Sequence, residues 1–188
     1  MSKWDLKKEN LKNLILLAQN NDIKAIETLI RREQKHIYAI FSHLTHEQED
    51  ISDLTQETLV KMANNISHLK EPEHFRAWLN KIISNTFYDF SKKNYKDKLS
   101  NDENQLNEIQ DKSTCAPDEK CTYAEVENSV KKALLTLPGS LRLSIVLREY
   151  EGLSYEDISR ITNTTIGTVK SRIARARLKL RELLADFI

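Results

Sequence analysis

Residues 151–184, near the end of the chain, carry the pattern that most restricts the fold. They read EGLSYEDISRITNTTIGTVKSRIARARLKLRELL, and apolar residues recur at helical spacing in the first part: Tyr155, Ile158 and Ile161. Ser154, with Asp157 three residues later, has the spacing of a capping box, which predicts a helix start. A polar run follows, and within it Asn163 enters left-handed backbone most readily. The pattern predicts a helix, a tight turn and a second helix.

The second helix is expected to begin near Thr165. Its apolar positions define an inward face: Val169, Ile173, Ala176, Leu180 and Leu183 or Leu184. From Thr165 to Arg181 there are six basic residues and no acidic one. A solvated surface helix is the ordinary interpretation of a charge run, but such helices usually mix signs. Charge of one sign after a tight turn instead favours a DNA-recognition helix of a helix-turn-helix unit.

Composition predicts an all-α soluble protein, because the 188 residues include only three Gly and three Pro, with 39% apolar and 30% charged residues. The net charge is only +1, so the basic character is local. No apolar run approaches the ~20 residues of a membrane span, and the N-terminus lacks the apolar core of a signal peptide. We therefore expect a cytoplasmic protein with no membrane insertion of its own.

The sequence also excludes several kinds of site. Cys115 and Cys121 are the only cysteines, and no His cluster lies near them, so two free thiols in a loop are favoured over a zinc site or a disulfide. We find no Gly-rich phosphate loop, no metal-ligand spacing and no nucleophile with a base. No metal, cofactor or enzymatic activity is expected.

Two amphipathic helices are predicted between Leu11 and Phe41, with Asp22 as the cap of the second. The segment 42–57 then holds five acids and no Lys or Arg. A helix over 50–66 buries five apolar residues, namely Ile51, Leu54, Leu59, Met62 and Ile66. It leaves outside Asp50, Asp53, Gln56, Glu57 and Lys61. That face is either solvated surface or a docking face for a basic partner.

The longest helix is predicted over 75–93. Its apolar residues are interpreted as core rather than as a stacking platform: Phe75, Trp78, Leu79, Ile82, Ile83, Phe87 and Phe90. The opposite side offers Arg76, Asn80, Lys81, Ser84, Asn85, Tyr88, Asp89 and Lys92. The cations at its end either complement the helix dipole or, with the amides and Tyr88, form a groove for phosphates and exposed bases.

A flexible acidic linker is predicted next, because residues 101–119 hold six acids, one Lys and a proline. The chain is thus divided into a helical domain over 1–97, a linker over 98–121, and a C-terminal helix-turn-helix domain over 122–188. A stop at Pro138 and Gly139 separates two helices of the second domain, the later one over 141–150. The arrangement of the two domains is left open, since a polar linker allows many.

Three segments, DISDLTQETLVKMA, HFRAWLNKIISNTFYDFSKKN and EGLSYEDISRITNTTIGTVKSRIARAR, resemble in sequence and order the bacterial sigma factors of the extracytoplasmic-function group. The resemblance implies a promoter-specificity factor that binds core RNA polymerase, recognises the minus-35 and minus-10 elements and assists DNA melting. It implies contact with the clamp helices of the largest polymerase subunit through Asp50, Asp53, Gln56, Glu57 and Lys61.

The resemblance also assigns the DNA contacts. It implies that the melted non-template strand at minus-10 meets Leu69, Lys70, Glu71, His74, Asn80, Lys81, Asn85 and Asp89. It implies that duplex DNA at minus-35 meets Gly167, Thr168, Lys170, Ser171, Arg172 and Arg175. An anti-sigma factor is a further expected partner.

The chain departs from the family pattern at three positions. Ala174 stands where relatives often carry a larger side chain on the DNA-facing helix, Asn163 replaces the usual turn glycine, and Pro72 lies where others often have glycine. Promoter preference therefore cannot be copied from a relative. The alternative function is a stand-alone helix-turn-helix regulator with an N-terminal dimerisation domain, which would bind duplex DNA as a dimer without polymerase.

Overall fold

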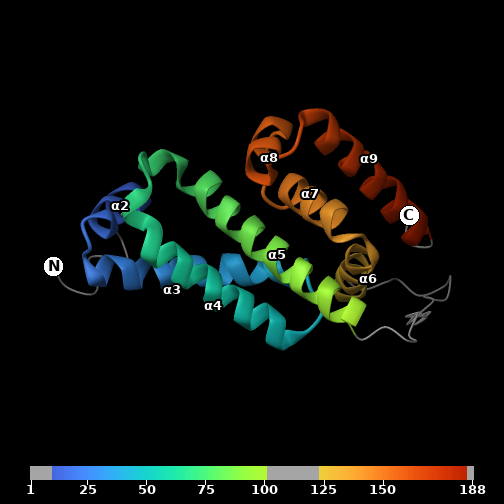
Figure 1. Ribbon diagram of the computed structural model, residues 1–188, viewed down its shortest axis with the longest axis horizontal. Helices are drawn as coiled ribbons and strands as arrows, with labels where there is room; N and C mark the ends of the chain where they lie inside the picture. The colour runs from blue at the N-terminus through green and yellow to red at the C-terminus, as the bar shows by residue number, and fades with distance from the viewer. Residues whose placement is uncertain (1–9, 101–122, 186–188) are drawn as a thin grey trace.

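The computed structural model describes residues 10–100 and 123–185, and of these it gives the backbone alone for 94–100 and 123–124. Within these ranges the regular elements are all helices, which confirms the predicted all-α class (Figure 1). No helix of the described part is long and apolar enough to cross a membrane. Most of the predicted linker over 98–121, with Cys115 and Cys121, lies outside the described residues.

In the described residues before the predicted linker, here called the N-terminal domain, there are four α-helices and two short 3-10 turns. They are α2 (Leu11–Gln19), α3 (Ile23–Ser42), α4 (Gln48–Asn65), η1 (Ile66–His68), η2 (Pro72–His74) and α5 (Phe75–Ser100). The predicted cap of α3 is confirmed, because the Asp22 carboxylate accepts a hydrogen bond from the Ala25 amide at 3.0 Å. All five apolar residues predicted for the core face of α4 are buried. Ile23, the first residue of α3, is 73% exposed.

The C-terminal domain contains α6 (Tyr123–Thr136), α7 (Gly139–Glu149), α8 (Tyr155–Thr162) and α9 (Ile166–Leu183). The predicted break before α7 is confirmed, but α7 begins at Gly139, two residues earlier than expected. The Pro138 carbonyl accepts from the amides of Leu141 and Arg142, so these residues already lie in the first turn. Val169, Ile173 and Ala176 of α9 are buried against the other helices, as predicted.

The two domains pack against each other, and α5 lies between the α2–α4 group and the C-terminal helices (Figure 1). One continuous cluster of buried apolar residues runs through both domains. Arg142 of α7 donates to the Leu44 carbonyl of the N-terminal domain at 2.6 Å and to the Leu135 carbonyl of its own domain at 2.7 Å. The rings of His43 and Tyr150 stack across the interface with centroids 4.0 Å apart. These contacts hold the two domains together, an arrangement called closed below.

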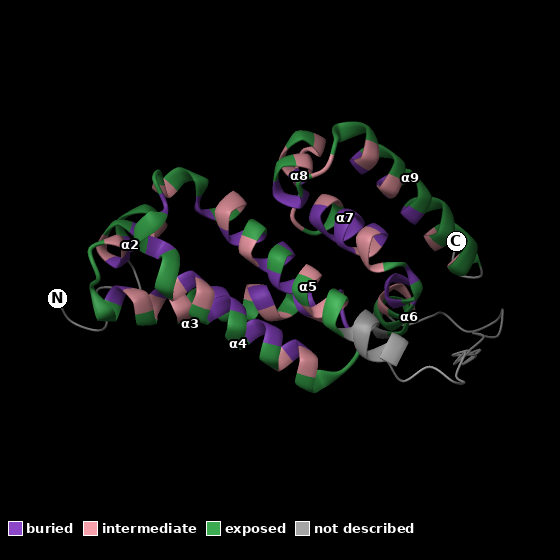
Figure 2. Cartoon of the chain, in the orientation of Figure 1, coloured by how far each residue is buried: buried purple, intermediate pink, exposed green. Residues whose placement is uncertain are grey.

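The structure corrects the sequence interpretation of α5 in three respects. The helix continues to Ser100 instead of ending near residue 93, because no Gly or Pro interrupts 94–100. Asn80 is 1% exposed and Ser84 is fully buried, although both were predicted on the open polar side. The C-terminal domain covers that side, as the mixed burial along α5 in Figure 2 illustrates. Trp78, Ile82 and Phe90 were predicted in the core but are only partly buried, and Trp78 and Phe90 pack against the edge of the core.

Candidate nucleic-acid interface

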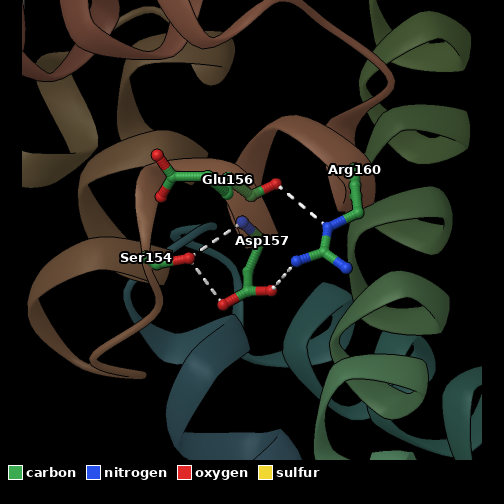
Figure 3. A network of polar contacts seen from close by, with 4 residues as sticks. All are labelled: Ser154, Glu156, Asp157 and Arg160. Atoms are coloured by element: carbon green, nitrogen blue, oxygen red, sulfur yellow. Dashed lines mark hydrogen bonds and ion pairs between the residues drawn. The ribbon is translucent and has the colours of Figure 1, made fainter.

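The start of α8 is fixed by the predicted Ser154–Asp157 pair, seen in Figure 3. The Ser154 hydroxyl accepts a hydrogen bond from the Asp157 amide at 3.0 Å and donates to the Asp157 carboxylate at 2.6 Å. The carboxylate thus bonds the serine side chain, whereas in a standard capping box it reaches the serine amide. Its other oxygen accepts from Arg160 at 2.8 Å. Because α8 has only eight residues, these contacts at its first turn matter for its stability.

The turn between α8 and α9 has the predicted left-handed residue. Asn163 adopts φ 50° and ψ 48°, and the following amide of Thr164 bonds the Ser159 carbonyl at 3.1 Å. Thr165 then caps α9, since its hydroxyl accepts from the Thr168 amide at 3.1 Å. Backbone groups at the end of α8 and at the start of α9 therefore both have hydrogen-bond partners. These local bonds set the direction of α9 relative to α8.

The outer face of α9 presents the residues predicted to meet minus-35 DNA. Those exposed are Gly167, Lys170, Ser171 and Arg175, and Thr168 and Arg172 are half-exposed. A Cβ at Gly167 would meet only the Thr165 hydroxyl at 3.8 Å, so the chain itself does not require glycine there. The absent side chain leaves room for the approach of another molecule.

Several polar groups of this face are bonded only to their own helix. The Ser171 hydroxyl donates to the Thr168 carbonyl at 2.9 Å, and the Arg175 guanidinium donates to the Ser171 carbonyl at 3.3 Å. Such exposed bonds can be exchanged for DNA contacts at small cost, because water already competes for them. Arg177, on the flank, is instead held by Glu149 at 2.7 Å, and this hydrogen bond raises the pKa of Arg177.

The loop before α5 is anchored from α2. The Gln19 amide donates to the Leu69 carbonyl, and Lys12 pairs with Glu73 at 2.6 Å. The hydrogen bond from Lys12 lowers the pKa of Glu73. Within the loop, His74 and Glu71 approach to 3.0 Å. These contacts hold in place the segment that the family resemblance assigns to the flipped base.

Predicted minus-10 residues gather around two hollows on α5. The first, about 340 Å³, is lined on the N-terminal domain by His68, Leu69, Lys70, Glu71, His74, Ala77, Trp78 and Lys81. Its other wall is α8, with Asp157, Arg160 and Ile161. The second, about 500 Å³, is lined by Lys61, Asn65, His68, Trp78, Lys81, Ile82, Asn85 and Asp89. The indole of Trp78 lies in both hollows, which a buried core residue could not do.

A third hollow, about 490 Å³, lies between the two predicted DNA-binding sets. Asn85, Tyr88, Asp89 and Lys92 line it from α5, and Thr162, Thr164 and Arg172 line it from the helix-turn-helix unit. Arg172 therefore faces α5, unlike the other predicted minus-35 residues. One terminal nitrogen of Arg172 is buried without a hydrogen-bond partner.

The acidic face of α4 is open. Asp53, Gln56 and Glu57 are exposed and Asp50 is half-exposed, as predicted, and Val60 beside them is 57% exposed. Lys61 differs from the other members of this set, because its ammonium group lies between two helices. It pairs with Glu57 at 2.7 Å and donates to the Thr86 hydroxyl of α5 at 3.1 Å. Lys61 thus links the α4 face to the hollows on α5.

Sequence reasoning missed the residues that join the two domains. The side chain of Glu151, in the turn before α8, is 8% exposed and approaches His36 at 3.3 Å and Asn80 at 3.1 Å. Burial acts to raise the pKa of Glu151, but the hydrogen bonds from His36 and Asn80 outweigh it and hold the pKa below its usual value. Arg142 was missed as well. The sequence around Glu151 and Arg142 gives no local indication that their partners lie in the other domain.

Among the described residues, no three or more His, Cys, Asp or Glu side chains are placed to hold a metal ion. The polar groups gathered here are amides, hydroxyls, imidazoles, cations and one indole, together with the carboxylates of Glu71, Asp89 and Asp157. Such groups bind phosphates and bases through hydrogen bonds, charge and stacking.

Comparisons with known proteins match both domains. A family model described as "Sigma-70 region 2" matches residues 29–96, and one described as "Sigma-70, region 4" matches residues 127–180. The ECF RNA polymerase sigma-E factor of Haemophilus influenzae is 33% identical over 177 residues, which cover 87% of this chain and 89% of that protein. The ECF RNA polymerase sigma factor SigE of Mycolicibacterium smegmatis is 31% identical over 162 residues; the chain spans 61% of that longer relative.

A solved structure gives the same assignment. The sigma factor RpoE of Bartonella quintana, in complex with the anti-sigma factor NepR, matches with a TM-score of 0.68 and 29% identity. The match covers 86% of this chain and 98% of that one. The region 2 match ends within α5, and the region 4 match begins within α6. The chain belongs to the family of ECF RNA polymerase sigma factors.

Proposed function

We propose that this chain is a promoter-specificity factor that brings core RNA polymerase to a two-part promoter and stabilises the melted minus-10 region. The observation that carries the proposal is the division of labour among three helices. An open acidic face on α4, hollows with an indole on α5 and a basic face on α9 are distinct surfaces of one chain. A stand-alone regulator has no evident use for the first two.

Polymerase docking is assigned to α4. Asp53, Gln56 and Glu57 offer carboxylates and an amide to a basic partner, and Val60 offers an apolar contact in the same stripe. Charge complementarity of this kind mainly raises the association rate and selects the partner. The partner proposed is the pair of clamp helices of the largest polymerase subunit.

Promoter contacts are assigned to the other two helices. Thr168, Ser171 and Arg175 of α9 reach base edges and phosphates of the minus-35 duplex, and the remaining cations track the backbone. At minus-10 a flipped non-template base enters the hollow beside Trp78. Flipping costs a few kcal/mol of unstacking, which contacts with the loop over 69–74, Asn85 and Asp89 and the charge of Lys81 must offset.

Two further proposals follow from the family. We assign the chain to the cytoplasm, where polymerase acts, and we expect an anti-sigma factor to bind it. The second rests on the similarity to RpoE of Bartonella quintana, whose structure was solved with such a partner.

The test separates the surfaces with two variants in one polymerase assay. Asp53→Lys should weaken binding to core polymerase while leaving the helix-turn-helix unit intact. Arg175→Ala should leave polymerase binding unchanged and weaken promoter binding by ~1–3 kcal/mol if it meets a base. Binding is measured with labelled chain and purified core polymerase, and promoter use by transcription in vitro. If both variants match wild type in both assays, the assignment of surfaces is wrong.

A further inference from the structure

Glu151 is a carboxylate of the C-terminal domain whose two polar neighbours, one of them a hydrogen-bond donor, belong to the N-terminal domain. One oxygen lies 3.3 Å from the His36 Nε2 atom of α3 and accepts a hydrogen bond from the Asn80 amide of α5 at 3.1 Å. Both neighbours lie at least 71 positions away from Glu151 along the chain. The contact therefore exists only while the two domains are closed.

The N-terminal domain provides a prepared site for this carboxylate. Asn80 is 1% exposed, and the cation of Arg76 is fixed nearby by its ion pair with the fully buried Glu33 carboxylate. Arg76 and His36 both act to lower the pKa of Glu151. A buried carboxylate without such partners would be strongly unfavourable. Removing Glu151 in turn leaves the Asn80 amide buried without its acceptor.

The closed arrangement covers part of one of the three proposed surfaces, the α5 surface for melted DNA, whereas Lys81, Asn85 and Asp89 of that surface stay exposed. Asn80 lies under Glu151, and α8 forms the far wall of the hollow that contains Trp78. Arg172 faces Asn85 and Asp89 across the third hollow. In contrast, the acidic face of α4 and most of the outer face of α9 remain exposed. The domain contact thus obstructs the part of α5 around Asn80 and the α8 side of that hollow, and it leaves the other two surfaces accessible.

We propose that Glu151 is an interdomain latch that keeps the free chain closed, so that Asn80 and the α8 side of the hollow beside Trp78 stay covered until the C-terminal domain moves away. The identity of the ligand of that surface rests on the proposed function, whereas the latch itself does not. Polymerase can dock on α4 with the latch closed, and single-stranded DNA competes with the C-terminal domain for α5. Breaking the latch shifts the closed-to-open ratio by the free energy of its hydrogen bonds.

The first experiment measures the conformation of the free full-length chain, without polymerase or DNA. Trp4→Phe makes Trp78, in the hollow whose far wall is α8, the sole tryptophan. Acrylamide quenching of Trp78 and the radius of gyration from X-ray scattering then report opening. Glu151→Lys places a cation beside His36 and Arg76. The charge-matched control is Glu149→Lys, whose parent residue is exposed and pairs with Arg177 of its own domain.

Glu151→Lys should shift the ratio roughly tenfold or more toward the open form, with a larger radius and stronger quenching, because charged hydrogen bonds are lost. Glu149→Lys should match wild type in both quantities. Asn80→Asp places a second carboxylate against that of Glu151, so it should open the chain through a change in the N-terminal domain. This variant replaces Glu151→Lys in the test if Glu151→Lys lacks native helicity. The latch is refuted if both Glu151→Lys and Asn80→Asp remain as compact and shielded as the control, or if wild type is already extended.

The second experiment measures binding of the free chain to a pool of random-sequence single-stranded DNA. Glu151→Lys should bind more tightly than the equally charged Glu149→Lys, by a factor that follows the opening measured above. Equal affinities, with opening demonstrated, would mean that the covered surface does not bind single strands. That result would count against the proposed function but leave the latch standing. If Glu151→Lys and Asn80→Asp did not open the chain, the latch would be refuted and the proposed function would be unaffected.

Discussion

The left-handed turn residue Asn163 offers a graded test of how the helix-turn-helix unit is held. Its φ of 50° and ψ of 48° place the Cβ of any L-residue close to the backbone carbonyl. Its side chain is exposed, so substitution there acts through the backbone alone. Replacing Asn163 by Gly, Ala and Val therefore changes the cost of the turn while leaving the core unchanged.

The expected magnitudes follow from that conformation. Left-handed backbone costs an ordinary L-residue roughly 1–2 kcal/mol, and Asn pays less than most. Asn163→Ala should lower the free energy of unfolding by about 1 kcal/mol, and Asn163→Val by about 2 kcal/mol because a β-branched side chain is crowded further. Asn163→Gly should stay within about 0.5 kcal/mol of wild type, since relief of strain is offset by greater freedom of the unfolded chain.

Urea unfolding followed by circular dichroism measures these differences, and the slope with urea should not change across the series. Binding to the minus-35 duplex should fall in the same order, because α9 loses its fixed direction when the turn fails. Equal stability of Asn163→Val and wild type would refute the reasoning, since it would mean that the turn does not require left-handed backbone.

Three further predictions concern stability. Ser154→Ala should cost about 1 kcal/mol of unfolding free energy in a urea titration, whereas Ser154→Thr, which keeps the hydroxyl, should cost less. Ile173→Ala, at a site 1% exposed, should cost about 2–5 kcal/mol by the same method; a loss below 1 kcal/mol would contradict its place in the core. Burial and the charge of Lys131 lower the pKa of His43 below 6.5, so its neutral ring is favoured in the fold. The associated stability is complete above pH 6.5 and is lost as pH falls through the lowered pKa. His43→Phe should therefore show a smaller loss of melting temperature than wild type between about pH 7.5 and 5.5; an equal loss would exclude His43 as a source.

The features that the sequence predicted well are those set by neighbours along the chain. The caps at Asp22 and Ser154, the start of α9 near Thr165 and the left-handed turn at Asn163 each depend on bonds within about five residues. The core face of α4 follows equally from helical periodicity, since a stripe of Ile51, Leu54 and Met62 must be buried somewhere.

The features that the sequence could not supply depend on contacts between distant segments. Asn80 and Ser84 belong to the polar side of α5 by periodicity, yet both are buried, and Asn80 bonds Glu151 of the C-terminal domain. Arg142 reaches the carbonyl of Leu44, 98 positions away, and Glu151 reaches Asn80 across 71. Trp78 packs against the core and also lines a hollow, and helical spacing alone does not reveal the second role.

The proposed roles of the site residues remain predictions, although membership of the family is established by the comparisons. Each set lies on an element that the sequence identified, and two residues changed their meaning once the fold was in view. Lys61 bonds α5 as well as the acidic face, and Arg172 faces α5 across a hollow. These two positions join surfaces that the sequence treated separately.

The most direct measurement of the central claim is transcription in vitro with purified core polymerase from a pool of random promoter sequences, with and without this chain. The account predicts stable binding to core polymerase and enrichment of transcripts from templates that share a two-part motif, one part upstream near minus-35 and one near minus-10. Contradiction would come from a chain that ignores core polymerase yet binds duplex DNA tightly as a dimer. In that case the helix-turn-helix unit would act alone, and the acidic face of α4 would be ordinary solvated surface.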